Sequence, residues 1–394
     1  MKILHRAGKE SINCLGCFDA FLYICQGTAR SWMLQSHDPR SSIICSQDDC
    51  ILQDRGEVIF VASQNWVRQD LGQQTDGSLR PKRRSTINQD CFTTAIFALK
   101  SAGIKSVGTF DFLNPRREEV YLRGLENLRA MNLIDENGTI TPSGTAAFTL
   151  PLSIDLVWHN AFEEAIKLGC LSELIDIAAL VSVKSICLIP PETLHAADVL
   201  HEQFMDPLSD HLSELNALYA YLHRKRNMST EELAIWCHET FLNAASLEEA
   251  LELRQKLIQW CKEELGVSEI SFLTPHDKDY HVKIRKAIAK GFVHHAGIKD
   301  VSCHQRQYLT LENNPVFLFP RSALGTDWQW VVYHRIETFA PSLQYMDRCT
   351  VVEQDWLLEN DYFYPINLPK DDNGKVRVEM LRILFDRMDR PYQP

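Results

Sequence analysis

The sequence has no excess of positive charge and no long hydrophobic run. Among its 394 residues, 41 Lys and Arg stand against 52 Asp and Glu, which gives a net charge of −11. A protein-wide basic field for nucleic acid is therefore excluded, and any such contact must use a local surface. No stretch approaches the roughly 20 apolar residues of a membrane-spanning helix. Residues 1–6 turn polar before an apolar run forms, so we expect neither a secretory signal nor a membrane partner.

The twelve cysteines also lack the spacing of a structural zinc site. Cys14 and Cys17 form one close pair, whereas Cys25, Cys45 and Cys50 follow singly. Such a site needs four ligands, usually arranged as two close pairs. A zinc site in this region stays an alternative, but we favour reduced cysteines of a nuclear or cytosolic protein and expect no metal.

Residues 1–85 are poorly patterned, with short apolar pieces near 21–25 and 58–62 that are compatible with strands. From residue 86 the pattern is clearer. An amphipathic helix is predicted over 117–132, and Asn137-Gly138 lies between two short apolar pieces, as in a tight hairpin. A helix followed by a small hairpin is typical of a winged-helix unit, which we expect over 86–152.

The rest of the chain divides into a helical and a β-rich part. Helices are predicted near 155–168, 171–182, 194–204, 211–224, 230–243 and 247–264, and they form a bundle over 153–270. Over 271–394 we expect one more helix at 279–291, strands near 306–311, 315–319, 328–337 and 347–352, and a terminal helix at 376–389. The predicted fold class is mainly α with a small antiparallel β-barrel.

Four sets of short runs follow one another in order along the chain. The runs are LKSAGI (99–104) with FDFLNP (110–115); LENL (125–128), LIDENG (133–138), TPSG (141–144) and LPL (150–152); DHL (210–212), LNALY (215–219), WC (236–237), FL (241–242), SL (246–247) and LRQKL (253–257); and IRKAI (284–288), GF (291–292), WVVYH (330–334) and WLLE (356–359). Together they resemble one protein family, the DEAH/RHA RNA helicases, and the similarity covers residues 86–390. It implies a winged-helix domain, a ratchet-like helical bundle and an oligonucleotide-binding barrel, as in the C-terminal region of the splicing and ribosome-biogenesis members.

The nucleotide motor of that family is absent from the sequence. There is no Gly-x-x-x-x-Gly-Lys-Ser/Thr loop to hold phosphates and no Asp-Glu-Ala-His motif to hold magnesium. We therefore expect no catalytic residue and no cofactor in this chain. ATP and magnesium would enter only if a motor is supplied elsewhere.

The resemblance places RNA against the ratchet and the barrel. Arg285 and Lys286 match family positions, and nearby lysines add charge for phosphate contacts. A salt-bridged surface is the alternative for all these cations. Phe319 stands where the family has His, and Arg321 replaces a small residue, so stacking and phosphate contact are expected there instead. The candidate RNA-binding residues are Lys283, Arg285, Lys286, Lys290, Phe319, Arg321, Tyr333 and His334.

Two other polar groups have a structural explanation. His294 and His295 lie near Cys303 and His304 in the sequence, but we expect packing at the entry to the barrel rather than metal binding. Asp210 opens a ratchet helix, for which we expect helix capping.

Three functions remain open from the sequence. The first is an RNA-binding or helicase-associated accessory module without a motor. The second is an incomplete version of a full ATP-dependent RNA helicase of RNA processing, and the third is a protein-interaction module without RNA binding. Single-stranded RNA, helicase activator proteins and RNA-processing complexes are the expected partners, with 110–150 and 285–340 as docking faces. The basic tract at 80–84 resembles a nuclear-localisation patch, although a solvated charge run in a linker explains it at least as well. We expect a nuclear location, with the cytoplasm as the alternative.

Overall fold

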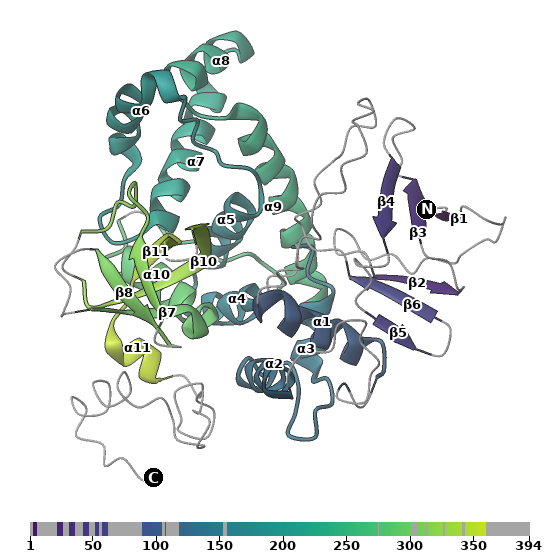
Figure 1. Ribbon diagram of the computed structural model, residues 1–394. Helices are drawn as coiled ribbons and strands as arrows, with labels where there is room; N and C mark the ends of the chain where they lie inside the picture. Colours follow the sequence, from purple (N-terminus) through teal and green to yellow (C-terminus); the bar gives the residue numbers. More distant parts are fainter. Residues whose placement is uncertain are drawn as a thin grey trace. The chain divides into compact units, whose positions relative to one another are not determined.

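The computed structural model divides the chain into two compact units, residues 1–156 and 157–394 (Figure 1). Each unit is considered by itself below. The residues that the structure describes are 3–5, 22–26, 31–35, 42–46, 52–54, 57–61, 89–104, 107, 118–152, 156–274, 276–300, 306–311, 314–325, 328–340 and 343–359.

The first unit contains two three-stranded antiparallel sheets, with strand orders β1-β3-β4 and β2-β6-β5. The two strands expected from sequence are β2 and β6, and they pair with each other. The other four strands, which are three to five residues long, were not expected from the sequence. The bounds are β1 Ile3–His5, β2 Leu22–Gln26, β3 Ser31–Gln35, β4 Ser42–Ser46, β5 Leu52–Asp54 and β6 Glu57–Val61.

Three helices follow: α1 (Gln89–Ser101), α2 (Glu118–Ala130) and α3 (Pro142–Phe148). The expected turn is present, because Ile134 and Ile140 form a β-bridge and Gly138 has a φ of +72°. Helix α3 was not expected. Thr141 begins it by accepting a hydrogen bond from the Gly144 N–H at 3.0 Å, and Pro142 supplies a preset φ at its first turn. These helices share one apolar core: Ile96, Phe97, Leu99, Val107, Leu128, Met131, Leu133, Ile134, Ala147 and Leu156.

The second unit begins with the helical bundle that the sequence predicts. Helix α5 has the expected ends, and the other helices differ from the expected ones by a few residues at their ends. The short 3-10 turns are Pro191–Thr193 and Glu202–Phe204. The helices are α4 Val157–Leu168, α5 Leu171–Ser182, α6 Leu194–His201, α7 Asp210–Asn227, α8 Thr230–Glu239 and α9 Ala244–Glu264.

Helix α10 (Tyr280–Gly291) connects the bundle to the barrel and packs against α4. Gly291 allows this close approach, because a Cβ atom there would lie 2.8 Å from the Val157 carbonyl oxygen and 2.8 Å from the Ala161 Cβ atom. Beside this contact the indole of Trp158 is fully buried, with its ring centroid 5.1 Å from that of Phe292. No helix in the described ranges is both long enough and apolar enough to cross a membrane.

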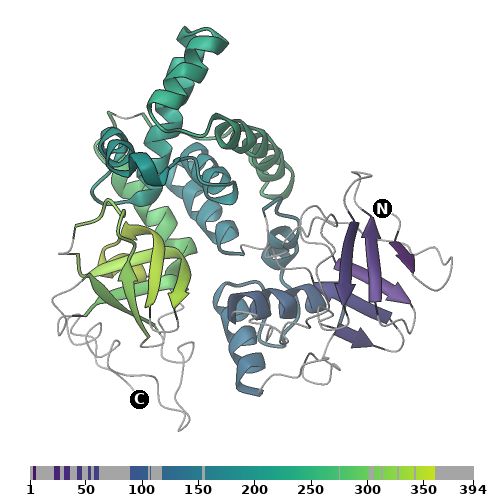
Figure 2. The same cartoon turned by 45° about the horizontal axis from the view of Figure 1, so that its top comes forward.

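Five strands then close into a barrel in the order β10-β11-β9-β8-β7, with β10 pairing back to β7 (Figure 2). All pairs are antiparallel except β9 with β11. A short helix, α11 (Gln354–Leu358), follows. The predicted mainly helical fold with a small barrel is confirmed, whereas the predicted helix at 376–389 lies outside the described residues. The strands are β7 Ala296–Lys299, β8 Gln307–Thr310, β9 Pro315–Leu318, β10 Trp330–Ala340 and β11 Leu343–Val351.

Candidate nucleic-acid interface

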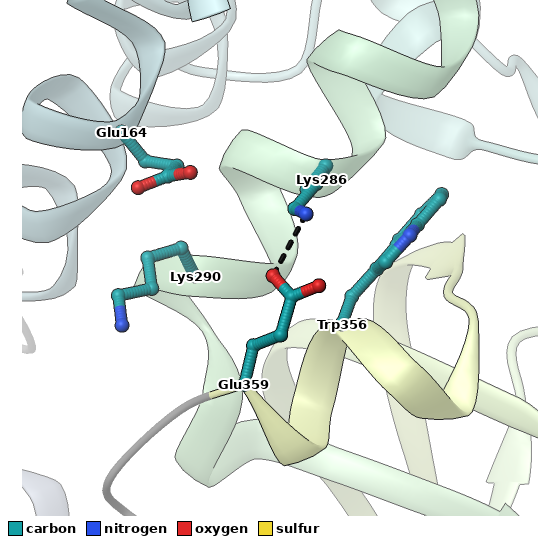
Figure 3. A pocket seen from close by; sticks show the side chains of 5 residues that line it. All are labelled: Glu164, Lys286, Lys290, Trp356 and Glu359. Carbon is teal, nitrogen blue, oxygen red and sulfur yellow. Dashed lines mark ion pairs between the residues drawn. The ribbon is translucent and has the colours of Figure 1, made fainter. Parts of the chain in front are cut away.

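Helix α10 carries two of the expected cations into a polar hollow of about 170 Å³ (Figure 3). Lys286 and Lys290 are four residues apart, which places them on one face of the helix. The hollow is not purely basic, because the Lys286 Nζ atom lies 2.7 Å from a carboxylate oxygen of Glu359. Glu164 from α4 and the ring of Trp356 complete the lining. A phosphate bound here would have to compete with Glu359 for Lys286.

Arg285 has a different role from the expected one. Only 5% of the residue is exposed. Its Nη1 group donates a hydrogen bond to the Val351 carbonyl at 3.0 Å, and its guanidinium lies 5.3 Å from the ring centroid of Trp356. Burial also lowers the pKa of Arg285. The expectation of phosphate contact is thus corrected: Arg285 fastens α10 to β11. Lys283, two residues earlier, is half-exposed.

Tyr333 and His334 are also placed differently from the expectation. Tyr333 is 6% exposed, belongs to the barrel core, and stacks on His295 with ring centroids 5.1 Å apart. The ring centroid of His334 lies 5.6 Å from that of Phe292 and 6.5 Å from that of Trp158, and burial holds its pKa well below the usual range. One side of β10 faces the barrel interior and the other faces the bundle, so neither ring offers a stacking surface to RNA.

The packing role expected for His294 and His295 agrees with these ring contacts, since their two ring centroids are 4.3 Å apart beside Tyr333. Cys303 and His304, like Cys14, Cys17 and Cys50, lie outside the described residues. Within the described part of the chain, no group of three or more His, Cys, Asp or Glu residues is arranged to hold a metal ion.

The segment after β9 carries the other two candidates. Arg321 contacts a carboxylate of the bundle, with its Nε atom 2.9 Å from an oxygen of Asp198 on α6. Phe319 is half-buried and lies in a group of four aromatic rings, which we call the barrel aromatic cluster. Its members are Phe317, Phe319, Phe339 and Tyr345.

The barrel aromatic cluster is built by strand register. Phe317 on β9 is paired directly with Tyr345 on β11, and their ring centroids are 6.2 Å apart. Phe319 lies two residues further on and so on the same side of the pleat, 6.0 Å from Tyr345. Phe339, near the end of β10, has its ring 5.5 Å from Tyr345 and is 62% exposed. An exposed aromatic group of this kind provides a surface on which bases can stack.

Sequence reasoning identified only Phe319 of these four rings. The strands were expected to end at 337 and to resume at 347, so Phe339 and Tyr345 fell in a presumed connection. The structure extends both strands, and 341–342 is the only stretch between them. The available signal was the spacing of Phe317 and Phe319, two residues apart in a strand and therefore on one face.

The side chain of Asp210 contacts the barrel and does not cap helix α7. Ser209 is the N-cap of α7, with its hydroxyl accepting from the Leu212 N–H at 3.2 Å. The Asp210 carboxylate accepts hydrogen bonds from the Ser322 hydroxyl, the Ala323 N–H and the Cys349 N–H at 2.7, 2.8 and 2.9 Å. The capping role expected for Asp210 therefore belongs to Ser209.

Burial shifts the pKa values of His211 and Asp210, the first two residues of α7. The two shifts have opposite effects on the stability of the folded state as the pH falls. Burial lowers the pKa of His211 to about 3, with the positive charge of Arg348 adding to the effect. The folded state therefore resists protonation of His211, and stability is lost as the pH falls below the unfolded value of about 6.5. Burial raises the pKa of Asp210 to about 6, so the folded state takes up that proton first and gains stability as the pH falls through 6.

A variant without the imidazole isolates the first effect. Between pH 7 and pH 5, we expect the free energy of unfolding of the wild type to fall by ~2 kcal/mol relative to that of His211→Gln. Urea unfolding of both proteins at the two pH values gives the comparison. The variant also loses the hydrogen bond between His211 Nδ1 and Thr350 Oγ1, but that loss is present at both pH values. Parallel pH dependences would contradict the prediction.

Comparison with known proteins agrees with this geometry. A family model described as an oligonucleotide/oligosaccharide-binding (OB) fold matches residues 284–360, which include most of α10 and all five barrel strands. The pre-mRNA-splicing factor ATP-dependent RNA helicase prp22 of Schizosaccharomyces pombe is 28% identical over 309 residues. The match covers 77% of this chain and 25% of that relative, so the chain corresponds to about a quarter of its length.

The barrel is thus a helicase-associated OB domain. Together with the prp22 match, it identifies the chain as a module related to the C-terminal region of the DEAH-box RNA helicases. The resemblance expected from the short sequence runs is confirmed.

Proposed function

We propose that this chain is an RNA-binding, helicase-associated module whose barrel binds single-stranded RNA through the barrel aromatic cluster. The observation that carries the proposal is the place of the four rings. Phe317 lies on the third barrel strand, β9, and Phe319 directly follows that strand. Phe339 and Tyr345 lie on either side of the connection between the fourth and fifth strands, β10 and β11. In OB folds the second and third strands and the connection between the fourth and fifth bind oligonucleotides.

The charges around the cluster favour stacking over phosphate contact as the source of affinity. Arg335 on β10 lies 2.8 Å from Glu337 and 3.1 Å from Asp347, and Arg321 is paired with Asp198. These cations are already compensated by carboxylates. Affinity that depends on phosphate contacts falls steeply with added salt, so we expect the affinity of this surface to fall less steeply than that of a basic groove. Stacking also gives little choice of base sequence.

The proposed activity depends on a motor that these residues do not supply. The name of the prp22 relative describes an ATP-dependent RNA helicase of pre-mRNA splicing. We propose that ATP and magnesium act on such a motor and that this module holds the RNA beside it, within an RNA-processing complex of the nucleus. Residues 110–150 and 285–340 are the proposed docking faces for helicase activator proteins. The basic tract at 80–84 and residues 110–117 lie outside the described residues.

Removing the most exposed ring tests the proposal. We expect Phe339→Ala to weaken binding of single-stranded oligouridine of about twelve nucleotides by about tenfold, because stacking on an aromatic ring contributes about 1–3 kcal/mol per base. Fluorescence anisotropy of labelled RNA at about 50 mM salt, where phosphate contacts are least screened, gives the affinity. Phe272→Ala is the matched control, since Phe272 is 71% exposed but lies outside the barrel.

The outcomes separate the candidate functions. Weaker binding by Phe339→Ala alone supports the barrel aromatic cluster as the RNA site. Equal affinities of wild type, Phe339→Ala and Phe272→Ala would reject this site. If the wild type binds no RNA even at low salt, the net charge of −11 favours the protein-interaction module instead.

A further inference from the structure

The segment from residue 319 to residue 324, which we call the Phe319 loop, is held by its own turn, by Arg306 and by a buried leucine. The Ser322 N–H donates to the Phe319 carbonyl at 2.9 Å and forms a turn. The guanidinium of Arg306 donates to the carbonyls of Pro320, Ser322 and Leu324 at 3.3, 3.2 and 2.5 Å. At its end the loop inserts the side chain of Leu324, 2% exposed, into the barrel core.

Asp210 adds a second contact between this loop and the helical bundle, beside the pair that Arg321 forms with Asp198. Two of its three hydrogen bonds come from the loop, from the Ser322 hydroxyl and the Ala323 N–H. The third comes from the Cys349 N–H on β11, the strand that also carries Tyr345. One carboxylate thus joins two of the segments from which the barrel aromatic cluster is built.

Helix formation does not require this carboxylate. Ser209 already caps α7, and all three hydrogen bonds that Asp210 accepts come from the barrel side of the molecule. A side chain used only to begin the helix would instead accept from the N–H groups of its own first turn.

We propose that Asp210 is the positioning residue for RNA binding by the barrel: it fixes the Phe319 loop to α7 and so sets the ring of Phe319 against those of Phe339 and Tyr345 before RNA arrives. Ordering these rings in advance lowers the entropy lost on binding. The inference rests on the proposed RNA-binding function and names the residue that prepares the site. Because Asp210 holds the first turn of α7 to the Phe319 loop, a shift of α7 would also move the barrel aromatic cluster and the RNA bound to it.

The chain contains a matched control for this proposal. Glu214 lies one helical turn after Asp210 and also connects α7 to β11, because its carboxylate accepts from Arg348 at 2.8 Å. Among the described residues, the Glu214 carboxylate forms no hydrogen bond or ion pair with the Phe319 loop. Glu214→Gln therefore weakens the attachment of the bundle to the barrel and leaves the loop anchored.

The experiment uses the full chain with Asp210→Ala, Ser322→Ala and Glu214→Gln. Amide hydrogen exchange over 319–324 reports loop order without RNA, and anisotropy with oligouridine reports affinity. For Asp210→Ala we expect exchange protection at Ala323 to fall by about tenfold or more and affinity to fall by about tenfold. Ser322→Ala, which keeps the carboxylate but removes one donor, should show smaller losses of both. Glu214→Gln should stay within about twofold of the wild type in both measurements.

A double variant tests whether Asp210 acts through the ring. Once Asp210 is removed, loss of Phe319 should have little further effect, so Asp210→Ala with Phe319→Ala should bind RNA like Phe319→Ala alone. Fully additive losses would overturn the proposal, as would an unchanged loop in Asp210→Ala or equal losses in Glu214→Gln. If Asp210→Ala does not fold, Ser322→Ala decides by the same two measurements. Absence of RNA binding by the wild type would reject the proposed function, and the exchange data would still decide whether Asp210 orders the loop.

Discussion

Arg348→Ala is expected to lower the free energy of unfolding of the second unit by ~3–5 kcal/mol, because it leaves the Glu214 carboxylate without its cation and removes the better buried of the two cations beside Asp347. The Arg348 side chain is 11% exposed. Its Nε atom lies 2.8 Å from Glu214 and its Nη1 atom 2.6 Å from Asp347, and these carboxylates raise its pKa further above the usual range. Ala keeps a Cβ atom, so the strain of the positive φ of 50° is the same in both proteins.

Arg335→Ala provides the control, since Arg335 pairs with the same Asp347 at 3.1 Å but its side chain is 55% exposed. An exposed pair contributes about 0–1 kcal/mol, so this variant should unfold almost like the wild type. Urea unfolding followed by tryptophan fluorescence gives both values. Similar losses in the two variants would mean that the surroundings of Arg348 are more hydrated than the structure indicates.

Trp158→Ala is expected to lower the free energy of unfolding by ~3–5 kcal/mol, because it removes a large buried ring from a packed core. The indole is fully buried, and its centroid lies 6.0 Å from that of Phe162 and 6.5 Å from that of His334. The ring thus fills the space where α4 meets the end of α10 and strand β10. We expect the loss to appear as earlier melting of the bundle and barrel together.

The matched control is Trp328→Ala, because Trp328 is 38% exposed at the surface of the barrel. Its backbone carbonyl accepts the hydrogen bond from Tyr308, and that bond survives the substitution. Thermal unfolding by circular dichroism should place Trp328→Ala near the wild type and Trp158→Ala well below it. A small effect of Trp158→Ala would show that α4 and the barrel do not depend on each other for stability.

The helices were predictable because their apolar residues recur with the helical period. Helix α5 begins and ends where the sequence predicts, and α10 begins within one residue of the prediction. Helix α3 was not predicted because a seven-residue segment is too short to show the helical period of apolar residues. Thr141-Pro142 is nevertheless a typical start of a helix. The division of the chain into four segments stays a prediction. In the structure the bundle and the barrel form part of one compact unit.

The interface was less predictable because it depends on partners far apart in the chain. The burial of Arg285 could have been anticipated, since it lies beside Ile284 and one turn before Ala289, both buried. Tyr333 and His334 point to opposite sides of β10, and only the bundle packed outside the barrel explains why both are enclosed. The barrel aromatic cluster needs the parallel register of β9 with β11, which no local pattern reveals.

Closure of the barrel has a consequence for self-association. A strand at the edge of a sheet presents unpaired backbone groups to which another chain can add. In the described barrel every strand has two neighbours, because β10 pairs with β7. The two sheets of the first unit are open, and β1, β4, β2 and β5 are their outer strands. Among the strands described, strand addition by another chain would therefore begin at β1, β4, β2 or β5 and not at the closed barrel.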